Sequence, residues 1–194
     1  ISKQADKQAD VERLSRIVYA TAPTREGRPS LQAALRQLVE QALAKQLIAD
    51  TPRAIFVVGF GLRFDLAALS DFAELRTQVD SVSGKIATVG AEAEMKFVRT
   101  LLTGDVMEPV TIGLRFIDLL AHVAPGTSLR HIGKLINRPK LDIPPPYSIE
   151  RMDEYLREDP AGFEAYAMRD AEIAVLYGLR LAAFIRDKLN IQSL

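Results

Sequence analysis

Apolar and polar positions recur with two different periods along the chain, and this pattern predicts an α/β fold. Residues 31–47 carry leucines and alanines at helical spacing behind Ser30, a suitable N-cap. Residues 54–60 (AIFVVGF) form a short, continuous apolar run that predicts a central strand covered on both faces. A helix is expected over residues 65–79, and residues 110–117 (VTIGLRFI) alternate as a strand does. Strands that alternate with helices are typical of an α/β domain.

The second half of the chain is predicted to be mostly helical. Ser128 should cap a short helix that ends at Asn137, and residues 138–148 (RPKLDIPPPYS) form a proline-rich, extended loop. Another helix begins at Ser148. A long final helix is expected over residues 160–189, with proline at its first position.

The remaining segments carry weaker signals. Short strands are predicted at residues 16–21 and 85–89, whereas residues 90–109 follow no clear period. Residues 1–29 are interpreted as an N-terminal segment, partly disordered or an incomplete start of the fold. Residues 30–194 are then expected to form the domain itself.

Composition narrows the possible chemistry. The chain has 194 residues, 25 basic and 25 acidic side chains, no cysteine and two histidines, His122 and His131. Thiolate and histidine-rich metal sites are excluded, so any metal must be held by carboxylates, which favour Mg²⁺ or Mn²⁺. Zero net charge counts mildly against nucleic-acid binding, although metal ions can neutralise part of a substrate's charge. No apolar run or leader indicates a membrane or secretion, so a cytoplasmic location is expected.

The first candidate for chemistry follows the strand at 54–60. The chain continues through Gly61 and Leu62 into Arg63-Phe64-Asp65. A carboxylate just beyond the carboxyl end of a strand lies where α/β sheets place their ligands. Taken alone, Asp65 is better explained as the N-cap of the following helix.

The second candidate is Tyr166-Ala-Met-Arg-Asp170 on the final helix. A spacing of four residues places the tyrosine and the carboxylate on one helix face. The same face continues through Ile173 and Tyr177, so we expect it to point inward. A buried carboxylate is costly unless it is paired or bound to a metal. The alternative is a solvated Asp170 beside Arg169, with Tyr166 in the core.

Together, the two features resemble the exonuclease domain of DEDD-type 3′–5′ exonucleases in the tyrosine subclass, particularly those of family B DNA polymerases. Phe64-Asp65 matches the second acidic motif of that family, and the Y-x-x-x-D of residues 166–170 matches the third. Between them, a strand ending at Asp118 precedes Ser128-Leu129, as in the family. The resemblance covers residues 54–184.

The resemblance implies an RNase H-like α/β fold, a mixed sheet flanked by helices. It also implies cleavage with two Mg²⁺ or Mn²⁺ ions about 3.5–4 Å apart. Asp65 and Asp170 would each hold a metal, Tyr166 would orient the attacking water, and Arg63 and Phe64 would contact the substrate. That substrate would be the 3′ end of single-stranded DNA, with a polymerase domain or subunit as partner. The implied activity is metal-dependent 3′–5′ exonuclease activity, as in proofreading.

The sequence departs from the family at its first motif, D-x-E on the first strand. Asp10-Val11-Glu12 is the only match before Asp65, and its polar surroundings do not predict a buried strand. The motif therefore lies upstream of Ile1 or has been lost. If it has been lost, the domain is a degenerate RNase H-like module that binds nucleic acid or a protein. A third hypothesis is an unrelated α/β domain in which Asp65 and Asp170 lie far apart.

The other polar features are interpreted more simply. His122 and His131 are expected to be structural or surface residues. A loose basic group near the proline-rich loop could contact phosphates, but a solvated face is the more ordinary explanation. Its members are Arg130, Lys134, Arg138 and Lys140.

Overall fold

The structure is a computed structural model that describes residues 27–74, 81–82, 85–86, 93–97 and 109–189. The predicted strand at 16–21 lies outside these residues. The chain divides into two compact units, and each is described by itself. The first comprises residues 1–57 and 61–121, and the second comprises residues 58–60 and 122–194. Helices alternate with strands along the described chain, which confirms the predicted α/β class.

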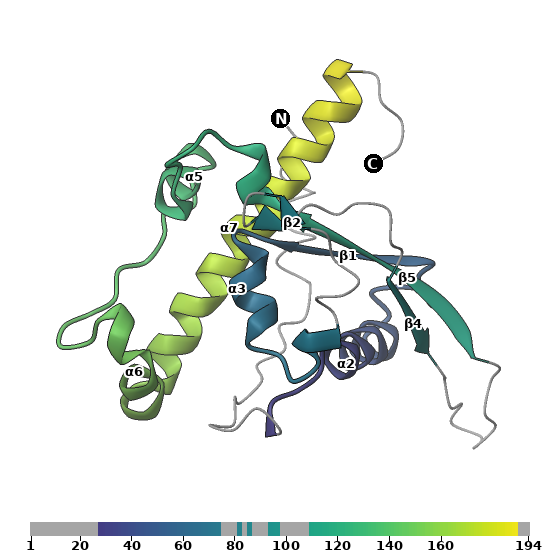
Figure 1. The fold of residues 1–194 in the computed structure, drawn as a ribbon, viewed down its shortest axis with the longest axis horizontal. Helices are drawn as coiled ribbons and strands as arrows, with labels where there is room; N and C mark the ends of the chain where they lie inside the picture. Colours follow the sequence, from purple (N-terminus) through teal and green to yellow (C-terminus); the bar gives the residue numbers. More distant parts are fainter. Residues whose placement is uncertain (1–26, 75–80, 83–84, 87–92, 98–108, 190–194) are drawn as a thin grey trace. The chain divides into compact units, whose positions relative to one another are not determined.

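Three described strands form the main sheet, in the order β1-β5-β4 (Figure 1). They are β1 (Ala54–Gly59), β4 (Ala93–Phe97) and β5 (Val110–Asp118). Strands β4 and β5 are antiparallel, with Met95 opposite Ile112. The predicted strand at 110–117 is thus confirmed, while β4 falls in the stretch that showed no clear period. A separate antiparallel pair joins β2 (Ser81–Val82) to β3 (Lys85–Ile86), the described part of the strand predicted at 85–89.

Strands β1 and β5 run in the same direction, so the sheet is mixed. Near their beginnings, Gly113 N donates to Arg53 O at 2.9 Å. Beyond their ends, Gly61 N donates to the Asp118 carboxylate at 2.9 Å. The prediction that β1 is a central strand covered on both faces is wrong for the described sheet. Strand β5 is central and β1 lies at one end of the order, and Phe56 on β1 is 49% exposed. An apolar run indicates a strand but determines neither its position in the strand order nor the burial of both its faces.

One face of the sheet packs against α2 (Leu31–Ala44). Every second residue of β5 is buried from Ile112 onward, as expected for a half-covered strand. Ser30 caps α2 as predicted, its hydroxyl accepting a hydrogen bond from Ala33 N at 3.0 Å. The buried core of this unit consists of Leu31, Leu35, Val39, Leu62, Leu66, Met95, Phe97, Ile112, Leu114 and Phe116.

The helix after β1 differs from the prediction. Helix α3 spans Leu62–Ala67, so it begins three residues earlier than expected and ends much sooner. Its N-cap is Gly61 in the left-handed conformation, with φ at 81°, which a glycine adopts at little cost. Helical backbone returns only at residues 72–74. Asp65 therefore does not cap this helix but lies in its first turn.

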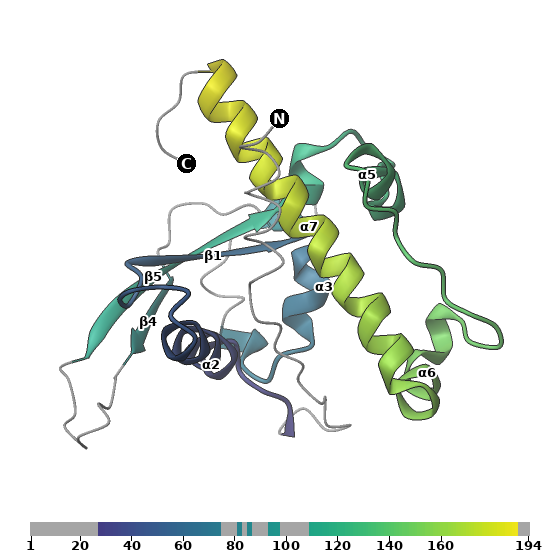
Figure 2. The same ribbon diagram turned by 180° about the vertical axis from the view of Figure 1, so that it is seen from behind.

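The second unit is built on α7 (Pro160–Leu189), which begins and ends as predicted. Helix α6 (Met152–Glu158) lies beside the N-terminal part of α7 in both views (Figures 1 and 2). It follows a short 3-10 turn, Ile149–Arg151, which begins directly after Ser148. Helix α5 (Leu129–Leu135) also packs on α7. No helix in the described ranges combines the length and the apolar character that crossing a membrane requires.

Two small clusters hold these helices together. Ile132 and Ile136, from the α5 region, pack against Ile173 of α7. Tyr147 stacks on Tyr155 of α6, with ring centroids 4.7 Å apart, and fixes the end of the proline-rich loop. As predicted, Ser128 caps α5 by accepting from His131 N at 3.2 Å, and Asn137 closes it with a positive φ of 61°. The Tyr155 ring also meets Phe163 of α7 edge to face.

Candidate active site

Tyr166 and Asp170 lie one turn apart on α7. The helix begins directly after Asp159, whose carboxylate accepts a hydrogen bond from Gly162 N at 2.9 Å. Tyr166 is only 8% exposed, and the face that it begins continues into the fully buried Ile173. The predicted inward face of this helix is therefore confirmed, with Asp170 half-buried on it.

The two carboxylate oxygens of Asp170 have different surroundings. Oδ2 accepts a hydrogen bond from the Lys140 ammonium, and the pair is also a salt bridge. Oδ1 is buried, and no hydrogen bond reaches it from the part of the chain that the structure describes. A buried acceptor without a partner costs free energy, so such an atom calls for an explanation such as a bound ion or water.

Lys140 also contacts Tyr166. Its Nζ lies 4.3 Å from the centroid of the tyrosine ring, within the range of a cation–π interaction. One ammonium thus joins the phenol and the carboxylate of the Y-x-x-x-D motif. This pairing could not be predicted from the sequence, because Lys140 precedes Asp170 by 30 residues and lies in a proline-rich loop.

The predicted basic group is largely neutralised within the chain. Arg130 pairs with Asp142 at 2.6 Å, and Arg138 pairs with Glu172 at 3.1 Å. Together with the Lys140 pair, these contacts show that three of its four cations have carboxylate partners. The prediction of a loose, solvated basic face is therefore wrong for Arg138 and Lys140, whose side chains are 25% and 18% exposed.

Tyr155 adds a second phenol to this unit. Burial, followed by the nearby Asp159 carboxylate and the Tyr166 phenol, raises the pKa of Tyr155. A Cβ added to Gly162 would lie 2.8 Å from the Tyr155 hydroxyl, so the first turn of α7 is tightly packed against Tyr155.

The first candidate motif belongs to the other unit. Arg63, Phe64 and Asp65 are all exposed at the start of α3, just beyond the end of β1. Phe64 is 80% exposed, an unusual position for so large an apolar side chain. The Arg63 and Phe64 side chains are thus accessible to solvent. The structure thus brings Tyr166 and Asp170 together in the second unit, and places Arg63, Phe64 and Asp65 side by side in the first.

Asp118 is structural in this fold. It is 2% exposed, and its Oδ1 accepts hydrogen bonds from Gly61 N at 2.9 Å and Leu120 N at 3.0 Å. It therefore fixes the turn that leads from β1 into α3. The carboxylate reaches the two backbone groups because it is the last residue of the strand next to β1.

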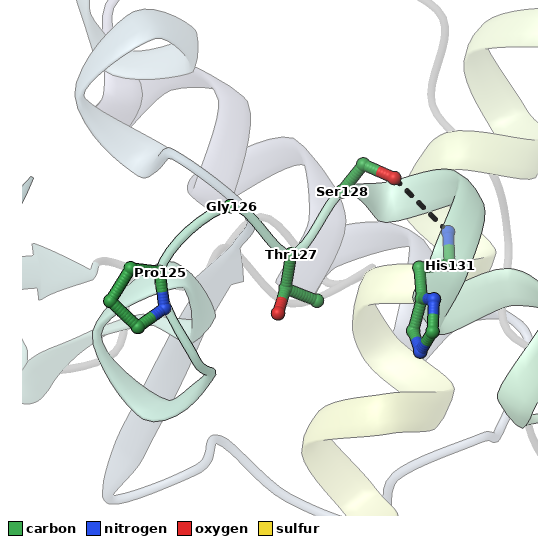
Figure 3. A pocket seen from close by; sticks show the side chains of 5 residues that line it. All are labelled: Pro125, Gly126, Thr127, Ser128 and His131. Carbon is green, nitrogen blue, oxygen red and sulfur yellow. Dashed lines mark hydrogen bonds between the residues drawn. The ribbon is translucent and has the colours of Figure 1, made fainter.

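A shallow hollow of about 300 Å³ lies before α5 in the second unit (Figure 3). It is lined by Pro125, Gly126, Thr127, Ser128 and His131. The Ser128 hydroxyl is engaged by the backbone of His131, and this helix cap is marked by the dashed line. His131 is exposed, in agreement with the predicted surface role.

The described residues do not by themselves complete a metal centre. Within the described ranges, no three or more histidine, aspartate or glutamate side chains come together as a metal site would require. Asp170 nevertheless has a buried carboxylate oxygen, Oδ1, that receives no hydrogen bond from the described residues. Asp10 and Glu12, the sequence's only candidates for the first motif, lie outside the described residues.

Comparison with known proteins relates the chain to part of a DNA polymerase. Over 189 residues, 92% of the chain, it is 33% identical to the primer-independent DNA polymerase PolB of Escherichia coli. The chain spans 22% of the length of that protein. No family model matches the chain. No solved structure matches it either.

Proposed function

We propose that this chain is a metal-dependent 3′–5′ exonuclease domain acting on single-stranded DNA. The observation that carries the proposal is the pairing of Tyr166 with a half-buried Asp170 whose Oδ1 has no hydrogen-bond partner among the described residues. Relationship to a segment of a DNA polymerase supports DNA as the substrate and proofreading as the setting. The RNase H-like form of the α/β fold belongs to the same proposal.

The chemistry would be hydrolysis of the last phosphodiester bond. The oxygen of a water molecule attacks phosphorus, the bond from phosphorus to the 3′ oxygen breaks, and that oxygen takes up a proton. A nucleoside 5′-monophosphate leaves, and the strand is one residue shorter. The Tyr166 phenol would orient the attacking water through its hydroxyl, since a positioned hydrogen-bonding group selects one direction of attack.

Lys140 would act electrostatically. Negative charge increases on the phosphate oxygens as water attacks, and a fixed positive charge beside them stabilises that state. The ammonium lies against both Tyr166 and Asp170, so it is already placed beside the two motif residues. In the absence of metal, it also compensates the half-buried carboxylate.

Asp170 and Asp65 would hold divalent ions. Carboxylate oxygen suits Mg²⁺ and Mn²⁺, and the partnerless Oδ1 of Asp170 provides a site for such an ion. When bound, the ions would supply a Lewis acid and an activated water. Further ligands would have to come from outside the described residues, for which Asp10 and Glu12 are the candidates in this chain.

The exposed start of α3 would receive the DNA. Phe64 offers a ring on which a base can stack, because every base has an aromatic face. Arg63 beside it offers a cation for a phosphate. Neither contact depends on base identity, as expected for an enzyme that removes any terminal nucleotide.

The test is a cleavage assay on 5′-labelled single-stranded DNA with Mg²⁺ or Mn²⁺. Wild-type chain, Asp65→Asn and Asp170→Asn are compared with Asp187→Asn, a surface aspartate on the same helix as Asp170. A ladder of products shortened from the 3′ end should appear with wild type and the control only. A ladder that persists in Asp170→Asn would contradict the proposal. Labelled RNA of the same sequence, tested in parallel, would show whether DNA or RNA is the preferred substrate.

A second candidate is a DNA-binding module without cleavage. The observation that favours it is the salt bridge from Lys140, which already supplies a cation to Asp170. This module would retain single-stranded DNA in a binding assay and leave it intact with Mn²⁺. Loss of binding in Phe64→Ala, without cleavage by wild type, would select this candidate.

A further inference from the structure

The geometry points to Arg169 and Glu172 as positioning residues that hold residues 138–140 against α7 and so fix Lys140 on Asp170. The inference rests on the proposed function for its catalytic meaning. Arg169 occupies a variable position within the Y-x-x-x-D motif and Glu172 lies outside it, so neither is one of the two residues that define the motif. Both act through the segment that carries Lys140, which lies 30 residues upstream of Asp170.

Glu172 is the centre of the arrangement. Its Oε1 lies 3.1 Å from Arg138 Nε, and its Oε2 lies 2.9 Å from Arg169 Nε. Each of the three side chains is about a quarter exposed, between 24% and 26%. Partial burial reduces the screening of these ion pairs by solvent, so they are stronger than fully exposed pairs.

Arg169 makes the second connection. Its Nη1 donates a hydrogen bond to the Pro139 carbonyl at 3.0 Å. Two consecutive residues of α7 therefore hold two consecutive residues of the loop: Arg169 holds Pro139, and Asp170 holds Lys140. A guanidinium suits this task because its planar fork can contact a carboxylate and a carbonyl at once.

The opposite side of the segment is closed by α5. Arg138 N donates to Gly133 O at 2.7 Å. A Cβ on Gly133 would lie 2.6 Å from Arg138 O and 3.1 Å from Lys140 N, so the two backbones are in close contact. The segment is thus anchored by α5 on one side and by Arg169 and Glu172 on the other.

This anchoring matters because a lysine side chain is flexible. Its four-carbon stem loses conformational freedom when the ammonium is held in one place. A mobile backbone at residues 138–140 would add to that loss and leave the ammonium distributed over several positions. We therefore expect the Lys140 contacts with Asp170 and Tyr166 to depend on Arg169 and Glu172, although neither contributes an atom to them.

The experiment measures the chemical reactivity of Lys140 in the full chain, without metal or DNA. The chain is treated briefly with an amine-acylating reagent, and labelling of each lysine is read by mass spectrometry. Labelling of Lys140 should rise about ten-fold in Arg169→Ala and in Glu172→Gln. Labelling of Lys134, an exposed lysine on α5, should stay constant. Arg186→Ala on the same helix is the control, since Arg186 pairs with its neighbour Asp187.

Thermal melting accompanies each variant, so that a folding defect is recognised. If Arg169→Ala is not folded, Lys140 labelling is compared instead in two milder variants. These are the isosteric Glu172→Gln and the charge-retaining Arg169→Lys. Arg169→Lys should restore part of the protection, because one ammonium can reach either the carboxylate or the carbonyl but not both. Unchanged Lys140 labelling in folded Arg169→Ala and Glu172→Gln overturns the inference.

Cleavage kinetics separate this inference from the proposed function. In an active enzyme, Arg169→Ala should lower kcat several-fold with KM little changed, and should have no further effect in a Lys140→Met background. Cleavage by wild type together with an unchanged labelling pattern would retain the exonuclease and reject the positioning role. Raised labelling without any cleavage by wild type would support the positioning of Lys140 and reject the exonuclease.

Discussion

The Lys140 ammonium donates a hydrogen bond to Oδ2 of the Asp170 carboxylate, whereas Oδ1 is buried without a hydrogen-bond partner among the described residues. This carboxylate is only half satisfied, and such an arrangement is costly to maintain in a folded protein. A residue selected only for stability would pair both oxygens or be apolar. Under the proposed function, Oδ1 is where a divalent cation would bind.

Replacement of Lys140 by methionine should raise the metal affinity of the metal-free chain. The ammonium competes with a divalent ion for the Asp170 carboxylate, so its removal should lower the Kd for Mn²⁺ several-fold. Mn²⁺ titration followed by electron paramagnetic resonance measures this, with Lys188→Met near the end of α7 as the control. Equal affinities in wild type and Lys140→Met would mean that the ammonium does not compete for Asp170.

The same substitution should slow cleavage even though the metal binds more tightly. The positive charge beside Tyr166 would be lost at the point where the phosphate gains negative charge. We expect kcat to fall about 10²-fold. Single-turnover cleavage at saturating Mn²⁺ separates this loss from the change in metal affinity.

Replacement of Tyr166 by phenylalanine should remove the water-orienting hydroxyl and leave the ring in the core. Cleavage should fall about 10²-fold. The melting temperature should change little, because the buried ring and its contact with Lys140 are retained. Tyr147→Phe is the matched control, since its hydroxyl bonds Glu158 at 3.2 Å in the same unit. Equal loss of cleavage in the two variants would argue against a role for the Tyr166 hydroxyl.

Features determined by neighbours in sequence could be predicted. The Ser128 cap, the closure of α5 at Asn137 and the start of α7 at Pro160 depend on a few adjacent residues, and all three are confirmed. The inward face of α7 follows from helical periodicity alone, which placed Tyr166 and Ile173 correctly.

Features determined by distant contacts could not be predicted. The order of strands depends on pairing between distant segments, so the apolar run of β1 was wrongly placed at the centre. Helix α3 begins at Leu62 because Gly61 adopts a left-handed conformation while its N–H is bound by Asp118, 57 residues away. The role of Lys140 was missed for the same reason, since its partner lies on another element.

Substitution of Gly133 by alanine should destabilise the second unit. The new methyl group would lie 2.6 Å from Arg138 O and 3.1 Å from the Ile173 side chain, so backbone would have to move. Overpacking of this kind costs about 1–3 kcal/mol. Urea unfolding measures it, with Gly113→Ala as the control, because the nearest atom there is Arg53 O at an ordinary 3.7 Å. Equal unfolding midpoints for the two variants would show that α5 can separate from the loop at little cost.

Substitution of Asp118 by alanine should weaken both the fold and the start of α3. Its Oδ1 binds Gly61 N and Leu120 N, and both donors would lose this acceptor. A buried donor without a partner costs about 1–3 kcal/mol, so we expect a total loss of about 2–4 kcal/mol in the free energy of unfolding. Asp118→Asn retains one carbonyl oxygen and should lose less than half as much.

The effect of Asp118 on cleavage should be indirect. Gly61 caps the helix that carries Asp65, so loss of the bond to Gly61 should let Arg63, Phe64 and Asp65 change position together. Cleavage by folded Asp118→Ala, measured well below its melting temperature, should therefore decrease, while Asp118→Asn should remain close to wild type. If Asp118→Asn instead abolished cleavage at wild-type stability, the charge of Asp118 itself would be needed, and Asp118 would join Asp65 and Asp170 as a candidate metal ligand.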